Sequence, residues 1–417
     1  MALFRIVSTA IALIPVILFL RPALSERFSL SKNPEISASN ILPASRITGE
    51  DARYHYLLGL LAYDVHDRPD IEKAVGHYLL SLERNPTDAR TWLAIAKAYR
   101  DNGMKEMAEF SVRKAASLDR NNSTITWESG VFFLLEGSTS EAIRLFRRYI
   151  SMVPGEQESV YSLCYSMGVE TAHLLENLVP AEYDFYRRYL GFLASNKLLS
   201  ESGDVWKRMK EMNPRREDYL RYIDFLIGSG GMEKAGKEWD DFVKTFKVME
   251  EAGHPEELLW NGGFELPLEN GGFDWRIGKA EGVRVFRDKD IKWLGETSLS
   301  VNFDGQSNPG IAIAQEIVPV EPGKRYKLTG FIKTDKLTTL NGIILEVSGF
   351  LCDPFVMKTE PVTGTTMWKK TELEFTAPST CRAMRVGIKR EKSAKLDSKI
   401  GGDAWIDSLS MTEVKSK

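Results

Sequence analysis

Small and large apolar side chains recur along the first part of the chain at a fixed interval. Small residues stand 34 positions apart, at Ala74, Ala108 and Ala142. A large side chain follows four positions after each of them, at Tyr78, Val112 and Phe146. Residues four apart share one face of an α-helix, and a small side chain lets a second helix approach that face. The interval therefore predicts packed helical hairpins.

The partner helix of each predicted hairpin has a small position of its own. These positions are Gly59, Ala96, Gly130 and Cys164. The first interval, 37 residues, is longer than the others, which predicts a three-residue insertion around 64–69. Proline lacks the N–H that a helix interior needs, so Pro86 and Pro154 are expected to stop the second helices.

This interval, with its small and large positions, resembles the tetratricopeptide (TPR) repeat. The resemblance covers residues 50–156 and implies an α-helical solenoid whose first helices build a concave surface for a protein partner. The residues that it places on this surface are Arg90, Lys97, Trp127 and Tyr161. A basic and aromatic groove suits an acidic or C-terminal peptide segment. Taken singly, each residue fits a solvated helix face or a packed aromatic equally well.

The interval weakens in residues 157–252. Trp206 and Trp239 lie 33 residues apart, as do Met209 and Phe242. These pairs predict further, degenerate helical repeats up to residue 252. An unrelated helical bundle is the alternative for this stretch.

From about residue 253 the helical period gives way to short segments in which apolar and polar residues alternate. Such segments are 298–303, 326–333, 342–347, 370–375, 384–389 and 404–411. Alternation places one row of side chains in a core and the other in solvent, and Gly, Pro and Asn separate the segments. Residues 259–417 are therefore predicted to form an antiparallel β-sandwich (jelly roll), so the expected fold class is multidomain, α plus all-β.

Motifs at the two ends of this region resemble galactose-binding-like jelly rolls, especially carbohydrate-binding modules. They lie at 261–265 (Asn-Gly-Gly-Phe-Glu), 272–275 and 403–410. The resemblance implies adjacent first and last strands and a structural calcium held by Glu265 and Asp407, since calcium prefers oxygen ligands. The alternative is that both carboxylates cap strands and pair with basic side chains. The same roll also serves as a plain structural unit.

Carbohydrate recognition combines exposed aromatic rings, which stack on the apolar face of a sugar, with polar side chains that bond its hydroxyl groups. Trp293 lies in a predicted loop and is the stacking candidate, whereas Trp368 is expected in the core. The polar candidates on predicted strands are Gln315, Glu346 and Lys389. Their facing depends on the strand register.

The N-terminus is apolar without any period. Between Arg5 and Arg21 no residue carries a charge. The run fits either a secretory signal peptide or a membrane anchor over 1–24, and both interpretations stay open. Residues 25–49, rich in Ser, Asn and Pro, are predicted to be a flexible tether. Either interpretation implies an extracytoplasmic location in the cell envelope.

Composition and motifs exclude some functions. The net charge of -3, from 55 basic and 58 acidic residues, provides no positive field for nucleic acid. The five histidines form no metal-ligand spacing, and the sequence has no nucleophile elbow, phosphate-binding loop or dinucleotide fingerprint. The chain is therefore not expected to be an enzyme. Cys352 and Cys381 are either a disulfide of the β region or buried free thiols.

The expected function is that of a non-catalytic envelope scaffold, in which the solenoid binds a protein partner and the sandwich binds polysaccharide. The domain pair resembles repeat proteins linked to exopolysaccharide assembly or export, which is the role that this resemblance implies. One alternative is a purely protein-binding assembly factor with a structural β region. Another is a polysaccharide-active enzyme, which needs two opposed carboxylates across a cleft.

Overall fold

The computed structural model describes residues 51–64, 69–248, 257–395 and 398–415. The chain divides into two compact units, Met1–Met209 and Lys210–Lys417. The segments predicted as signal peptide or anchor and as tether lie outside the described residues, and so does most of the predicted insertion. Among the residues described, no helix combines the length and the apolar character that crossing a bilayer requires.

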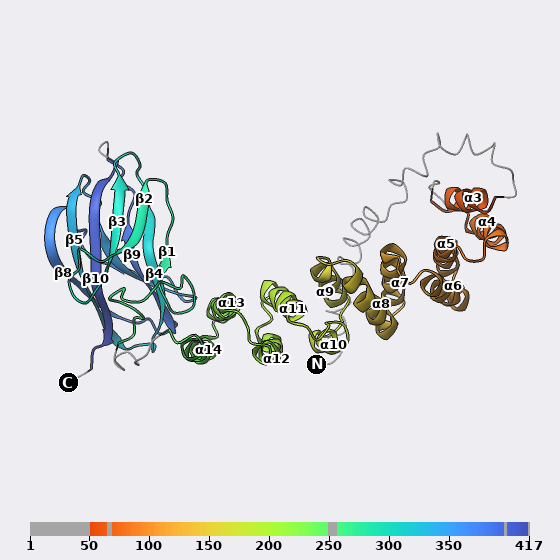
Figure 1. Cartoon of the computed structure of the whole chain (residues 1–417), viewed down its shortest axis with the longest axis horizontal. Helices are drawn as coiled ribbons and strands as arrows, with labels where there is room; N and C mark the ends of the chain where they lie inside the picture. Colours follow the sequence, from red (N-terminus) through yellow and green to blue (C-terminus); the bar gives the residue numbers. More distant parts are fainter. Residues whose placement is uncertain (1–50, 65–68, 249–256, 396–397, 416–417) are drawn as a thin grey trace. The chain divides into compact units, whose positions relative to one another are not determined.

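Short helices follow one another along the first unit (Figure 1). The first six are α3 (Ala52–Asp64), α4 (Ile71–Arg84), α5 (Ala89–Asp101), α6 (Lys105–Leu118), α7 (Ser123–Leu135) and α8 (Thr139–Met152). They pack as hairpins, α3 with α4, α5 with α6, and α7 with α8. The next are α9 (Gln157–Ser166), α10 (Thr171–Asn177), α11 (Tyr183–Ser195) and α12 (Leu199–Lys210). The helical half of the predicted fold is confirmed.

The small residues of the repeat lie where the two helices of a hairpin touch. A Cβ added to Gly59 would overlap the ring of Tyr78, and one added to Gly130 would lie 2.6 Å from the ring of Phe146. Real Cβ atoms do not approach other atoms so closely. The two glycines therefore make room for the large side chains that the sequence places on the partner helices.

The helix ends follow the sequence signals. Helices α4 and α8 end just before Pro86 and Pro154, because the residue preceding a proline disfavours helical geometry. The connection from α3 to α4 is longer than that from α5 to α6, which agrees with the insertion predicted in the first hairpin. At its far side Asp70 caps α4 by accepting a hydrogen bond from the amide of Lys73.

The second unit contains α13 (Arg216–Gly228), α14 (Met232–Thr245) and two antiparallel sheets of five strands (Figure 1). In sheet A the order is β1 (Arg276–Ile277), β4 (Ile311–Pro319), β9 (Ala383–Arg390), β6 (Ile344–Gly349) and β7 (Val356–Lys358). In sheet B it is β2 (Val283–Asp288), β3 (Ser298–Asp304), β10 (Gly401–Glu413), β5 (Arg325–Leu337) and β8 (Gly364–Thr376). The predicted β-sandwich is confirmed.

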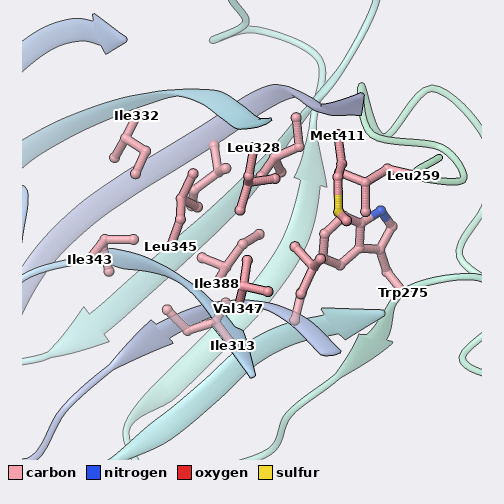
Figure 2. Packing of buried hydrophobic residues seen from close by; sticks show 14 of the residues in the cluster. Leu259, Trp275, Ile313, Leu328, Ile332, Ile343, Leu345, Val347, Ile388 and Met411 are labelled. Atoms are coloured by element: carbon pink, nitrogen blue, oxygen red, sulfur yellow. The ribbon is translucent and has the colours of Figure 1, made fainter. Parts of the chain in front are cut away.

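The hydrophobic core of this unit lies between the two sheets (Figure 2). Leu328 and Ile332 of β5 face Leu345 of β6 and Ile388 of β9, and Trp275 adds a completely buried indole. Inward and outward side chains alternate along each strand. The core therefore fixes which residues each sheet presents on its outer face.

Helices α13 and α14 pack against the opening segment of the sandwich. Gly272 lies against the indole of Trp239 in α14, so closely that an added Cβ would overlap it. The Gly272 amide also donates a 2.9 Å hydrogen bond to Asp224 of α13. Two ion pairs join the helices to the sandwich, Asp224 with Arg276 and Arg216 with Glu269. The hairpin and the sandwich belong to one compact unit.

A disulfide joins Cys352 and Cys381 within the sandwich. It ties the connection between β6 and β7 to the segment that precedes β9. Of the two states that the sequence left open, the structure has the bonded one. Cys164 is a free, buried thiol in α9, where the repeat predicts a small side chain.

Candidate functional site

Three of the polar residues expected from the sequence lie on one surface, the outer face of sheet A. Gln315 of β4 stands opposite Gly387 of β9, and Glu346 of β6 stands opposite the same glycine. Directly opposed residues of neighbouring strands point to the same side of a sheet. Lys389 lies two positions farther along β9, on that same side. The register thus brings Gln315, Glu346 and Lys389 together.

The same register extends to both edges of the sheet. Arg276 of β1 stands opposite Gln315, and Lys358 of β7 stands opposite Glu346. We call Arg276, Gln315, Gly387, Glu346 and Lys358, together with Lys389 beside Gly387, the polar row. Neighbouring strands lie about 4.8 Å apart, so the row is roughly 19 Å long. Its length suits an extended ligand that crosses the strands.

The charges along the row are partly paired. The Lys389 ammonium forms an ion pair with Glu346, which is 8% exposed. On its way the Lys389 chain passes Gly387, where an added Cβ would lie 3.3 Å from its Cε. Gln315 makes no side-chain hydrogen bond within the part of the chain that the structure describes. Its amide, with both donors and acceptor, is therefore available to a ligand.

One residue of this face was missed from the sequence. Arg385 precedes Gly387 by two positions on β9 and so shares its outward side. Its guanidinium lies 5.4 Å from the ring centre of Phe350. Its Nε is buried and has no hydrogen-bond partner among the described residues. The alternation of the β9 sequence contained the signal, because Arg385 and Lys389 have the same parity along the strand.

Trp293 lies on the opposite side of the sandwich, over the outer face of sheet B. It belongs to the connection between β2 and β3 and is 46% exposed. Its ring stacks on Phe331 of β5, with centroids 4.3 Å apart and planes 16° apart. Trp368 of β8 was expected in the core but lies on this outer face. Its ring centroid is 6.2 Å from that of Trp293. The structure therefore separates Trp293 from the polar row.

Glu265 and Asp407 hold the loop that carries Trp293. Oδ2 of Asp407 accepts hydrogen bonds from the amides of Trp293 and Leu294, at 2.7 and 3.1 Å. Oε1 of Glu265 accepts one from the amide of Glu296 at 3.0 Å. Burial raises the pKa of Asp407, and the hydrogen bonds from the amides partly offset the rise. These contacts give Trp293 a defined position.

The two carboxylates meet at one loop, as the predicted calcium site requires, but N–H donors face them. Calcium needs oxygen ligands, so the loop 293–297 would have to turn carbonyl groups inward. Within the described ranges, no group of three or more His, Cys, Asp or Glu side chains is arranged to hold a metal ion. As placed, Glu265 and Asp407 do not fit a calcium ion, and calcium stays a prediction.

No protein-family model matches the chain, and no curated protein matches its sequence. Among solved structures, the chain spans only 26% of the xylanase 10B modules of Clostridium thermocellum, with 17% identity over 34% of this chain and a TM-score of 0.25. A CBM4 module is similar over 37% of this chain and 99% of its own, with 16% identity and a TM-score of 0.28. A xylan-binding domain of CBM22 is similar over 39% and 99%, with 11% identity and a TM-score of 0.28. Similarity at this level identifies neither a family nor a ligand.

Two carboxylates lie inside the second unit, away from both outer faces. Oδ2 of Asp274 accepts a hydrogen bond from the Glu269 amide at 2.5 Å, and Oε1 of Glu316 accepts one from the Trp260 amide at 2.8 Å. The other oxygen of each has no partner among the described residues. Burial raises the pKa of Asp274 to about 6 and that of Glu316 well above its usual range. Both side chains are almost completely buried, so neither is exposed to a ligand on an outer face.

In the solenoid, two of the four expected groove residues line a common pocket. Arg90 and Lys97 of α5 face a space of about 160 Å³, together with Tyr56 of α3 and Glu128 of α7. Lys97 forms an ion pair with Glu128. Arg90 lies 6.0 Å from the centre of the Tyr56 ring. The pocket is therefore aromatic, and both of its cations have a carboxylate partner, since Arg90 also lies 3.6 Å from Asp88.

The other two expected groove residues lie elsewhere. Trp127 packs within its own hairpin, 5.3 Å from the ring of Phe146 and 5.0 Å from that of Tyr149 in α8. Tyr161 is completely buried, with the ring of Tyr189 4.9 Å away. The expectation for Tyr161 is wrong, because a side chain without exposed surface cannot line a groove.

Proposed function

We propose that the β-sandwich binds a polysaccharide along the polar row of sheet A. The observation that carries this proposal is the convergence of four polar side chains on one outer face: Gln315, Glu346, Arg385 and Lys389. A few convergent polar groups are what orients a hydroxyl-rich ligand. Gln315 also keeps hydrogen-bonding groups that no described residue satisfies.

The row favours a polymer over a small sugar. It runs from the edge strand β1, where Arg276 also pairs with Asp224 of α13, to the edge strand β7. A ligand along the row can therefore cross all five strands of the sheet. This geometry suits an internal stretch of a chain, bound across the strands.

The proposed role is binding without catalysis. The polar row has a single carboxylate, Glu346, which is paired with Lys389. Hydrolysis of a glycosidic bond usually takes two carboxyl groups on opposite sides of the bond. We therefore propose that the sandwich holds a polysaccharide and leaves it unchanged.

The disulfide between Cys352 and Cys381 supports an extracytoplasmic location, since disulfides persist in oxidising compartments. We propose that the chain is an envelope scaffold whose solenoid holds a protein partner while its sandwich holds polysaccharide, in exopolysaccharide assembly or export. The pocket around Arg90 favours partner binding. The Arg90 side chain lies 3.6 Å from Asp88 but remains 60% exposed, so its guanidinium can also receive a carboxylate of an acidic or C-terminal peptide. An acidic peptide that binds the wild type but not Arg90→Ala supports this role, and equal binding ends it.

Polysaccharide binding is tested with the full chain on neutral and acidic polysaccharides by affinity electrophoresis, followed by calorimetry. Gln315→Ala should lower the affinity about five- to tenfold, because a lost hydrogen-bonding group costs about 1 kcal/mol. Trp293→Ala changes the opposite face and is the matched control, which should bind like the wild type.

Two results would change the proposal. No binding to any polysaccharide by a folded chain ends it and favours a purely protein-binding assembly factor. Loss of binding in Trp293→Ala but not in Gln315→Ala moves the site to the outer face of sheet B.

A further inference from the structure

A pocket of about 760 Å³ opens at one edge of the sandwich. It lies between β1 and β2, which are the edge strands of sheets A and B. Part of its lining is apolar and comes from Leu268, Ile277 and Val285. These three side chains are partly buried and pack against the sandwich core. The pocket therefore has an apolar floor at the edge of the sandwich between β1 of sheet A and β2 of sheet B.

The charged lining of this pocket is basic. Arg276, Lys279 and Arg287 line it, together with the neutral Asn270, and no acidic side chain of the described residues does. Arg276 forms an ion pair with Asp224 of α13. Lys279 is exposed and forms no ion pair within the described residues. Three cations thus have one carboxylate partner between them, which leaves an excess of positive charge at the pocket.

Backbone carbonyl groups hold the guanidinium of Arg287 in place without neutralising its positive charge. Its Nε donates to the backbone carbonyl of Phe264 and its Nη2 to that of Glu265, both at 2.7 Å. Carbonyl groups are neutral, so they fix the plane of the guanidinium and leave the positive charge uncompensated. A guanidinium fixed in this way is pre-organised to bind a carboxylate.

The pocket continues the polar row. Arg276 belongs to both, because it lines the pocket and stands opposite Gln315 at the β1 end of the row. A polymer that lies along the row leaves sheet A across β1. The next part of that polymer therefore reaches the basic pocket.

Building on the proposed function, we infer that this pocket takes a carboxylate-bearing sugar, so that the ligand is an acidic polysaccharide containing uronic acid units. A uronic acid ring matches both features of the pocket. Its C–H groups pack on the apolar floor, and its carboxylate accepts charge-assisted hydrogen bonds from Lys279 and Arg287. A neutral sugar carries no negative charge that could compensate the excess positive charge of the pocket.

The test compares an oligomer of galacturonic acid with its methyl ester, by calorimetry on the full chain. Esterification removes the charge and keeps the ring. The acid should bind about tenfold more tightly than the ester, and added salt should reduce this advantage.

Lys279→Gln should remove most of the advantage of the acid over the ester, because glutamine keeps a hydrogen-bond donor but carries no charge. Among the described residues, Lys279 forms no side-chain hydrogen bond or ion pair that the substitution would break. Lys289→Gln is the matched control, because Lys289 is also exposed but does not line the pocket. It should keep the full preference for the acid.

The possible failures are distinguishable. Equal binding of acid and ester, or binding of a neutral polysaccharide alone, overturns the inference and leaves polysaccharide binding intact. A preference for the acid that survives both Lys279→Gln and Lys279→Glu shows that the charge is recognised elsewhere, which overturns the assignment to this pocket. Absence of binding to every polysaccharide overturns the proposed function itself.

Discussion

Replacing Asp274 with asparagine is expected to stabilise the sandwich above pH 6. The Asp274 side chain is completely buried, and its Oδ1 has no hydrogen-bond partner among the described residues. Burial raises its pKa from 3.8 to about 6, against the effect of the hydrogen bond from the Glu269 amide. Asparagine has nearly the same shape and still offers an acceptor to that amide, but it carries no charge at any pH.

The sign of the effect follows from proton binding. In the unfolded chain Asp274 loses its proton near pH 3.8, whereas in the folded sandwich it does so near pH 6. The wild type therefore loses stability as the pH rises from about 4 to 6, because the folded state binds the proton more tightly. Above pH 6 the difference between the two pKa values corresponds to about 3 kcal/mol. Asp274→Asn should recover most of this amount at pH 8 and well under 1 kcal/mol at pH 4.

Hydrogen exchange of peptides from β4 and β9 in increasing urea measures the stability of the sandwich separately from that of the helices. Glu316, the neighbouring buried acid, is present in both the wild type and the Asp274→Asn variant. Asp290→Asn, at an exposed site, is the control and should change the free energy of unfolding by less than about 0.5 kcal/mol. The same effect of Asp274→Asn at pH 4 and at pH 8 would refute the argument that a buried charge destabilises the sandwich.

Gly130→Ala should destabilise the α7–α8 hairpin by about 1–3 kcal/mol, because the added Cβ meets the Phe146 ring at 2.6 Å. Gly76→Ala in α4 meets nothing within 4 Å and should stabilise by about 0.5–1 kcal/mol; thermal unfolding that shifts the same way in both variants would contradict the packing described. Replacing Cys352 and Cys381 together with serine should cost about 3–4 kcal/mol, given their sequence separation of 29. An unchanged melting temperature of the sandwich in oxidising buffer would mean that the bond makes no contribution.

The helical hairpins were predictable because their packing depends on local spacing. Gly59 and Tyr78 occupy neighbouring helices of one hairpin, so a small residue and a large one at repeating positions are enough to place both. Tyr161 shows where this reasoning ends. Its position in the repeat suggests a surface groove, but Tyr189 of α11 packs on its ring. That contact comes from a region where the interval has decayed.

The outer faces of the sandwich were predictable only in part. Alternation along a strand gives the parity of Gln315, Glu346 and Lys389, and the observed register then places all three on sheet A. The alternation of side chains within a strand does not predict over which sheet a connecting loop lies. Trp293 was a candidate for the same ligand as those residues, but the carboxylate of Asp407 holds its loop over sheet B. Contacts that depend on residues more than a hundred positions apart leave no local signal.

The contact between Gly272 and Trp239 has a mechanical consequence. Together with the ion pairs of Asp224 and Arg216, it fastens α13 and α14 to the sandwich by side chains as well as by the backbone. If the sandwich binds a polysaccharide as proposed, a force on that polymer would reach α13 and α14 through the indole contact and both ion pairs as well as through the backbone. The last helical pair would then carry part of the load between the polymer and the rest of the chain.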